Sequence, residues 1–534
     1  MKKKLFVLLS IVLISLMVSA NAWATRSGGT FVFCAPYGGD VFSLDMQRTG
    51  NTQDYIVGLN IFRSLYKWDA AQNKPVPALA TQVDVSEDGM VYTFKLRENV
   101  KFHNGRIMTA DDIIYSYNRI MNPKMASSAA SYIKNIKGAA DVQAGKANAI
   151  SGMEKIDDFT LKITIEHAID LGYQLYKIET AIVPKEEVEA KGDAFGTHPV
   201  GCGPFKFVKW VKGSEIVLEK FSDYFEPGKP YIDKLIYKIM PEGSARDMAF
   251  RAKELDANLV GSAQYEVYQR DPEISKNMIE VAEMFTRHIG FNQAYKPLAD
   301  KRVRQAINHA INSELIIKKL IKSKAFKATS FLPTSSPAFD PDLAPYTYDV
   351  KKAKELMAAA GYKDGFDLEV IGTNSQSYGV RVVEALIPFL KKIGIRVKPQ
   401  QLEGGMLSQR LKKGNYQAYI WSLESGPDPL ASMNRFHSKT LPTSGNYLAY
   451  ANPEFDRFID QARITKDPVQ RLELVKKADR FLYEDAALWF FNYNKAIIAY
   501  QPWVHGVEAV AIEMMLQDFT NLWLDKTSPR ATAK

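Results

Sequence analysis

The alternation of hydrophobic and polar positions is clearest in the first half of the chain. Residues 83–97 alternate on both sides of a turn at 87–89, a pattern that predicts two antiparallel strands. A helix is predicted from Thr109, where Thr-Ala-Asp-Asp precedes apolar residues at helical spacing. Further β-prone runs occur at 29–35, 160–165, 205–211 and 216–219. This half is therefore predicted to be rich in sheet.

The pattern changes near residue 301, where apolar residues begin to recur at helical spacing. Helices are predicted around 301–311, 314–321, 349–361, 379–392 and 406–412, and strands at 367–371, 395–400 and 416–422. Strands that alternate with helices predict a parallel, doubly wound sheet, which binds ligands beyond the carboxyl ends of its strands. The loops at 372–378 and 423–429 follow two of these strands. We therefore expect both loops to open towards the other half of the chain.

The N-terminus carries the pattern of a secretory signal peptide. Three lysines precede an apolar run at 5–18, and small residues follow at 19–24. The apolar run is shorter than the roughly 20 residues that a membrane-spanning helix needs. We therefore expect residues 1–24 to be cleaved after Ala24, leaving an exported, soluble chain.

Length and charge narrow the class of protein further. A chain of 534 residues exceeds the roughly 250–300 residues of a single core, so more than one domain is expected. The net charge is +9, but lysines and arginines are scattered among acidic residues. Such a distribution indicates a solvated surface and no nucleic-acid partner.

The sequence carries no mark of an enzyme or of a metal site. Its seven histidines show no metal-binding spacing, and no Cys-x-x-Cys, Gly-x-Ser-x-Gly or phosphate-loop motif occurs. We therefore expect no catalytic residue, no metal and no cofactor. A secreted hydrolase with an unmarked site stays open as an alternative.

The two cysteines leave a choice that the sequence does not decide. Cys34 and Cys202 could form one disulfide or be two buried thiols. Cys202 lies in Pro-Val-Gly-Cys-Gly-Pro-Phe at 199–205, and its flanking glycines predict a close approach of backbone or ligand.

Four stretches of the chain resemble one protein family. They are 88–105 together with 109–112, then 199–205, 299–306 and 348–361. In this order they are similar to the signature of solute-binding protein family 5, the periplasmic receptors of dipeptide and oligopeptide ABC importers. The resemblance implies an α/β, two-lobe periplasmic-binding-protein fold with an extra subdomain in the first lobe and a discontinuous first lobe.

The resemblance also implies where the chain divides. The first lobe is expected at 25–290 and 500–534, with the extra subdomain at about 70–200, and the second lobe at 291–499. The two crossings between lobes are then expected near 287–296 and 491–504.

Several residues match positions that line the ligand cleft in this family. Asp428, in an Asp-Pro context, resembles the acid that anchors a ligand's α-ammonium, although it could instead form a turn. Trp421 could give a flat apolar wall or pack in the core. The remaining candidates are Asn446, Tyr447, Tyr37, Cys202, Gln376 and Tyr378. The last two occupy the stretch in which dipeptide-binding relatives carry a carboxylate-pairing arginine, which is absent here.

We therefore expect a periplasmic, monomeric receptor of an ABC importer. It would capture a peptide-like small solute between its lobes and deliver it to a membrane permease without making or breaking a bond. The alternative within the family is a receptor for a non-peptide solute such as an opine, a glycoside or a metal chelate.

Overall fold

The computed structural model describes residues 28–34, 40–375, 378–514 and 516–532. The expected signal peptide at 1–24 and two candidate site residues, Tyr37 and Gln376, lie outside these ranges. Within them, none of the helices has both the length and the apolar character needed to cross a membrane.

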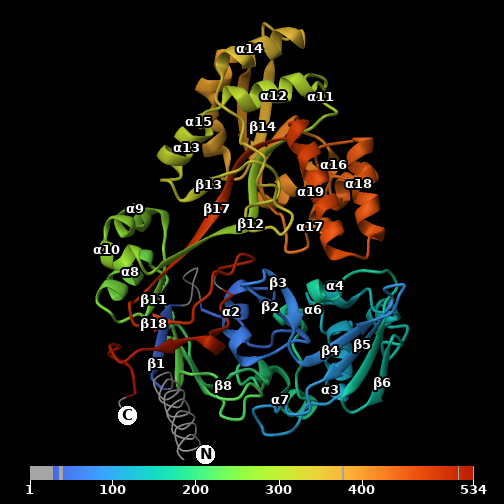
Figure 1. Cartoon of the computed structure of the whole chain (residues 1–534), viewed down its shortest axis with the longest axis vertical. Coiled ribbons are helices and arrows are strands. Elements are labelled where there is room, and N and C mark those ends of the chain that lie inside the picture. The colour runs from blue at the N-terminus through green and yellow to red at the C-terminus, as the bar shows by residue number, and fades with distance from the viewer. Residues whose placement is uncertain (1–27, 35–39, 376–377, 515, 533–534) are drawn as a thin grey trace, which may run out of the picture.

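A single large sheet runs through both ends of the molecule (Figure 1). In the described chain its strand order is β15 (Arg396–Gln401), β14 (Asp367–Gly372), β16 (Ala418–Glu424), β12 (Met278–Phe291), β17 (Leu488–Tyr500), β11 (Ala257–Leu259), β1 (Thr30–Cys34), β10 (Lys234–Lys238), β9 (Glu215–Lys220) and β8 (Phe205–Val211), and β13 (Ala325–Lys327) pairs with β17.

The long strands β12 and β17 connect the two lobes. They pair antiparallel from Met278 opposite Ala499 to Gly290 opposite Leu488, with a bulge between Ala282 and Thr286. β16 pairs with β12 at the second-lobe end, and β11 pairs with β17 at the first-lobe end. Both strands are rich in aromatic and β-branched residues, as expected for strands that are covered on both faces.

The first lobe is built on β1 and its neighbours. β1 is parallel to β10 and β11, while β8, β9 and β10 are antiparallel. One face packs against α2 (Thr52–Ile61), with Phe31 and Phe33 in the apolar cluster. The other face is covered by α8 (Gly243–Arg251), α9 (Ser262–Arg270) and α10 (Pro272–Ser275).

A subdomain with its own core lies beside the first lobe. Its sheet has the order β4 (Ala80–Val85), β5 (Val91–Leu96), β7 (Thr160–Thr164) and β6 (Met153–Asp157), all antiparallel. The strand pair and turn predicted at 83–97 are confirmed, and Thr109 and Asp112 form the predicted capping box of α3 (Ala110–Met121). The smaller elements of this region are β2 (Tyr66–Asp69), β3 (Lys74–Pro77), α4 (Ala130–Ile133), α5 (Ala139–Gln143), α6 (Gly172–Leu175) and α7 (Lys185–Lys191).

Helices cover both faces of the sheet in the second lobe (Figure 1). They are α11 (Lys296–Ala299), α12 (Lys301–Ala310), α13 (Ser313–Leu320), α14 (Val350–Ala359), α15 (Val380–Leu390), α16 (Gly404–Lys413), α17 (Pro429–Asn434), α18 (Pro453–Ile464) and α19 (Pro468–Glu484). β14 is parallel to β15 and β16, as predicted. β12, however, is antiparallel to both β16 and β17. The sequence made no prediction for β12, which brings the chain in from the first lobe instead of following a crossover helix.

The backbone around Cys202 explains its flanking glycines. A Cβ on Gly201 would lie 2.2 Å from the carbonyl oxygen of Ile61, at the end of α2, and one on Gly203 would lie 2.5 Å from the Ile61 carbonyl carbon. The Gly203 N–H donates to that same oxygen at 2.8 Å. Cys202 itself is fully buried, and burial raises the pKa of its thiol to about 12. Cys202 and Cys34 lie in separate apolar clusters, and no disulfide joins them.

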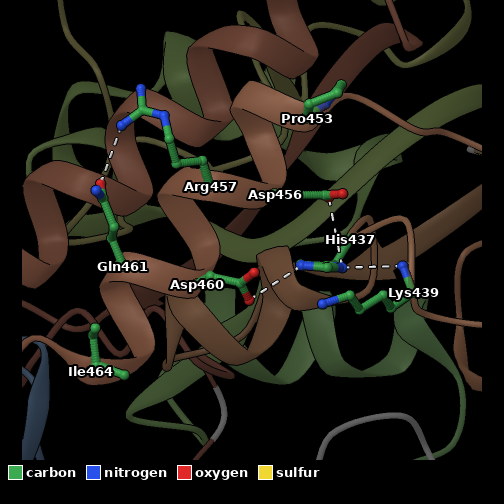
Figure 2. Close-up of a pocket in the computed structure, with 8 residues that line it drawn as sticks. All are labelled: His437, Lys439, Pro453, Asp456, Arg457, Asp460, Gln461 and Ile464. Atoms are coloured by element: carbon green, nitrogen blue, oxygen red, sulfur yellow. Dashed lines mark hydrogen bonds and ion pairs between the residues drawn. The ribbon is translucent and has the colours of Figure 1, made fainter.

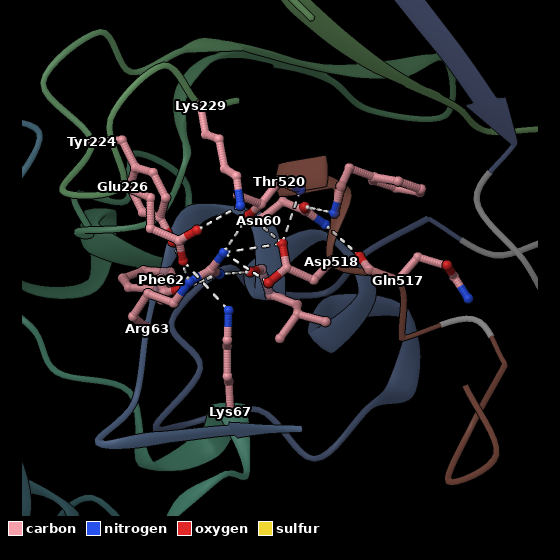
Figure 3. Close-up of polar contacts among 12 residues, drawn as sticks. Asn60, Phe62, Arg63, Lys67, Tyr224, Glu226, Lys229, Gln517, Asp518 and Thr520 are labelled. Atoms are coloured by element: carbon pink, nitrogen blue, oxygen red, sulfur yellow. Dashed lines mark hydrogen bonds and ion pairs between the residues drawn. The ribbon is translucent and has the colours of Figure 1, made fainter. Parts of the chain in front are cut away.

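The C-terminal segment packs on first-lobe elements. β18 (Val504–His505) pairs with β19 (Trp523–Leu524), and the ring of Phe519 lies 5.1 Å from that of Phe31. Arg63, whose side chain is 3% exposed, donates to Asp518 at 3.0 Å (Figure 3). Such packing fits the discontinuous first lobe that the family resemblance implies. The boundaries at 290 and 500 stay predictions.

We expect Asp518→Ala to lower the free energy of unfolding by about 3 kcal/mol, because it leaves the buried Arg63 without its ion-pair partner. Asp223→Ala is the matched control, since it removes an exposed ion pair with Lys101 that should contribute at most about 1 kcal/mol. Urea unfolding near neutral pH measures both. Equal losses in the two variants would contradict a stabilising role for Arg63–Asp518.

The stabilising contribution of the Arg63–Asp518 pair should decrease as the pH falls. Burial by itself would raise the pKa of Asp518. The positive charges of Arg63 and Lys67 outweigh this effect, so the pKa lies below its ordinary value. The contribution of the pair is therefore present above the unfolded-state pKa of about 3.9 and is lost as the pH falls through the lower folded-state pKa. The stability difference between the native chain and Asp518→Ala should shrink in acid.

Candidate functional site

Aromatic and charged side chains of the first lobe gather on short elements near the second lobe. Trp68 comes from β2, Tyr132 from α4 and Tyr176 from the residue after α6. The rings of Trp68 and Tyr176 lie 5.3 Å apart, and the Lys177 ammonium lies 5.1 Å from the Tyr176 ring and 5.8 Å from the Tyr132 ring. We call Trp68, Tyr132, Tyr176, Lys177 and Glu179 the first-lobe wall.

The charges in this wall are coupled to one another and to the second lobe. Burial by itself would lower the pKa of Lys177. Tyr176, Glu424 and Glu179 outweigh this effect, so the pKa lies above its ordinary value. Burial raises the pKa of Glu179 more than Lys177 lowers it. Since Glu424 belongs to β16, the wall faces the carboxyl end of a second-lobe strand.

The wall also holds a polar atom that lacks a partner. The indole N–H of Trp68 is buried and has no hydrogen-bond acceptor among the described residues. A buried donor without an acceptor costs about 1–3 kcal/mol. An acceptor on a bound ligand would recover that cost.

The second-lobe wall begins where β16 ends. Glu424 is exposed at the last position of β16, and its negative charge acts on Lys177, Tyr176 and Tyr132 of the first lobe. The next residue, Ser425, is fully buried, and its hydroxyl has no partner within the described chain. The position of Glu424 at the carboxyl end of a strand was the signal that could have singled it out in the sequence.

Asp428 caps α17 and also faces the first lobe. Its carboxylate accepts from the backbone N–H of Leu430 at 3.0 Å and of Ala431 at 3.3 Å. Burial raises its pKa despite these bonds, and Asp428 in turn raises the already elevated pKa of Tyr173 in α6. One carboxylate oxygen is therefore used for capping. The ligand-anchoring role of Asp428 stays a prediction.

The other candidates on this side fall into two groups. Trp421 and Tyr447 are half-buried against the apolar cluster that also contains Tyr419. Asn446 is 3% exposed, and its amide closes its own loop through His437 and Tyr450. Its polar atoms therefore serve the loop. Cys202 is fully buried in an apolar cluster, and its predicted contact with a ligand stays a prediction.

Tyr378 contacts Arg287, a cation that the sequence analysis did not single out. The guanidinium carbon of Arg287, on β12, lies 5.2 Å from the centre of the Tyr378 ring. Arg287 thus places a cation beside the 372–378 loop, which carries no lysine or arginine of its own. The two positions are 91 residues apart in the sequence, so no local pattern joins them.

A separate hollow of about 480 Å³ lies on the second lobe (Figure 2). At its centre the buried His437 lies 3.3 Å from a carboxylate oxygen of Asp460 and 3.7 Å from one of Asp456. Asp456 also accepts from the backbone N–H of Ser438 at 3.0 Å, so these contacts hold the 437–439 loop on α18. The described residues contain no group of three or more histidines, cysteines or acids arranged to hold a metal ion. We interpret this hollow as structural.

Comparison with known sequences gives relatives along nearly the whole chain. The dipeptide-binding protein of Escherichia coli (strain K12) is 27% identical over 510 residues, which cover 91% of this chain and 92% of that protein.

Solved structures and the family model agree with this result. MppA, a periplasmic murein tripeptide binding protein in its unliganded open form, matches with a TM-score of 0.84 and 23% identity over 94% of this chain and 98% of that one. The ABC transporter-associated periplasmic binding protein DppA from Helicobacter pylori, in complex with the peptide STSA, matches with a TM-score of 0.69 and 26% identity over 94% and 99%. The two-lobe fold is therefore confirmed. The model of the bacterial extracellular solute-binding proteins, family 5 (middle), matches residues 74–443, and the chain belongs to this family.

Proposed function

We propose that this protein is the substrate-binding receptor of an ABC importer and that it captures a peptide-like solute between its lobes. The observation that carries the proposal is Glu424, which stands at the carboxyl end of β16 and acts electrostatically on the aromatic and charged wall of the first lobe. An α-ammonium group is the natural partner for a carboxylate in this position. Relatives whose names specify dipeptides or peptides support the same ligand class.

Binding would work by population shift between open and closed arrangements. A solute held by Glu424 alone gains contacts with one lobe, whereas a solute enclosed by both lobes also reaches Trp68 and the tyrosines. The closed arrangement therefore gains affinity that the open one lacks. No bond is made or broken in this process, so the role is not enzymatic.

The proposed role implies where the protein is located and which partners it has. The N-terminal sequence pattern predicts export, and removal of residues 1–24 would leave a periplasmic monomer. Its partners would be the peptide-like ligand and the permease subunits of the importer in the inner membrane.

We expect unmodified di- and tripeptides to raise the melting temperature of the protein and their N-acetylated forms to fail, because acetylation removes the cation that Glu424 would pair with. Glu424→Gln should weaken binding of the unmodified peptides about 100-fold by calorimetry. Glu355→Gln, an exposed acid on α14, is the matched control and should change nothing. Equal binding of acetylated and unmodified peptides would refute the ammonium site.

We expect Asp428→Asn to weaken peptide binding less than about tenfold, because asparagine caps a helix as well as aspartate does and Asp428 already spends one oxygen on α17. The free energy of unfolding should change by less than about 0.5 kcal/mol for the same reason. Calorimetry and urea unfolding measure the two effects. A loss of affinity as large as that of Glu424→Gln would instead make Asp428 the anchor.

A further inference from the structure

A cluster of charged residues lies beside the bulge of β12, where the chain passes between the lobes. Arg287 belongs to β12, Glu283 to the bulge, and Lys324 to the residue just before β13. Glu283 is buried and accepts a hydrogen bond from the side-chain amide of Asn494. We call Arg287, Lys324, Glu283, Asn492 and Tyr378 the hinge cluster.

Positive charge exceeds negative charge in the hinge cluster. Glu283 acts on both Arg287 and Lys324, and among the described residues it is the one carboxylate that both cations share. Burial lowers the pKa of Arg287 and of Lys324, and Glu283 offsets only part of this effect in each case. A cation that is desolvated without a full counter-charge is costly, so the cluster favours a further anion.

Unpaired polar atoms of the cluster lie in one row across the sheet. Asn492 on β17 pairs in register with Arg287, and Ser422 on β16 pairs with Arg287 from the other side. Residues directly opposite each other on antiparallel strands project to the same face. Asn492 is fully buried, and neither its amide nitrogen nor its carbonyl oxygen has a partner among the described residues; the same holds for Nε of Arg287.

Such atoms point to a binding partner. Buried polar groups in native proteins are almost always hydrogen-bonded, and an exception calls for a ligand or another explanation. Arg287 and Asn492 together offer N–H donors from two adjacent strands. The guanidinium of Arg287 also lies over the ring face of Tyr378. A carboxylate accepts several N–H bonds at once and supplies the missing negative charge.

We propose that the hinge cluster binds a carboxylate of the ligand, with Arg287 as its main donor and Lys324 as a second cation. The inference rests on the proposed receptor function for its ligand class. In this proposal, Arg287 of β12 takes the role that the 372–378 loop cannot fill because it carries no arginine.

The geometry also limits the length of the ligand. Glu424 and Ser422 are two residues apart on β16 and so project to one face, about 7 Å apart along the strand. Ser422 lies opposite Arg287, so the ammonium site and the carboxylate site are separated by a similar distance. Two extended residues span about 7 Å. A zwitterion of dipeptide length therefore fits better than a longer peptide.

The first experiment compares Ala-Ala with its C-terminal amide by calorimetry. The native protein should bind the acid at least about tenfold more tightly than the amide. Arg287→Gln should remove this preference by weakening Ala-Ala alone, and Lys324→Gln should reduce it. Lys318→Gln, an exposed lysine on α13, is the matched control and should alter neither affinity. Equal affinity for acid and amide in the native protein would overturn the proposal, and so would a parallel loss of both in Arg287→Gln.

A second experiment separates this proposal from the receptor function. Sodium acetate, at ionic strength matched with sodium chloride, should raise the melting temperature of the native protein more than that of Arg287→Gln. If the native protein shows this larger shift but binds no peptide, the anion site is supported and the peptide-receptor function is refuted. Equal shifts in both proteins would overturn the anion site whether or not peptides bind.

Two further variants guard against a purely structural effect. Arg287→Lys keeps the charge and should retain part of the preference for the acid, so it carries the comparison if Arg287→Gln does not fold. Asn492→Leu replaces an unpaired buried amide with an apolar side chain of similar size, which should leave the melting temperature of the free protein unchanged or raised. The same variant should weaken Ala-Ala binding. A lower melting temperature together with unchanged affinity would show that Asn492 serves the fold alone.

Discussion

The antiparallel pairing of β12 with β17 is the constraint on which both lobes depend. Each strand begins in one lobe and ends in the other, and the bulge between Ala282 and Thr286 interrupts their ladder. Within this bulge the Met284 N–H donates to Ala511 of the C-terminal segment at 3.0 Å, and the Met284 carbonyl accepts from Ser425 at 2.8 Å. The hinge, the returning C-terminus and the loop after β16 are thus joined at one backbone position.

This junction explains how ligand binding and lobe movement can be coupled. Glu424, Ser425 and the hinge cluster all adjoin the bulge, so a ligand that pairs with them as proposed would also bear on the strands that connect the lobes. A shift from about 1% to 99% closed protein requires a difference in binding free energy of about 5.5 kcal/mol. Pairing of two ligand charges, together with contacts to the first-lobe wall, is of the right order.

Local sequence signals predicted local structure well. The helix cap at Thr109, the helices at 314–321 and 349–361 and the strand pair at 83–97 were all confirmed, because a helix end or a tight turn depends on a few neighbouring residues. The direction of β12 was not predictable in this way, since it depends on which lobe the chain comes from. The Arg287–Tyr378 contact joins a strand to a loop that is distant in the sequence. The glycines beside Cys202 predicted a close approach of backbone or ligand, and it is the backbone of Ile61 that approaches them. The family resemblance brought the second-lobe loops to attention, and the structure added the electrostatic effect of Glu424 on Lys177 and Tyr176 of the first lobe.

Closure of the lobes around a ligand is the central claim, and an interlobe distance tests it most directly. Ser131 on α4 and Val469 on α19 are exposed in the first and second lobes, while the native Cys34 and Cys202 are buried, so spin labels on Ser131→Cys and Val469→Cys would report only on the two lobes. Pulsed electron–electron double resonance would measure the distance between the labels with and without Ala-Ala. The account predicts a shorter distance and a narrower distribution when the peptide binds. An unchanged distribution at saturating peptide would contradict it.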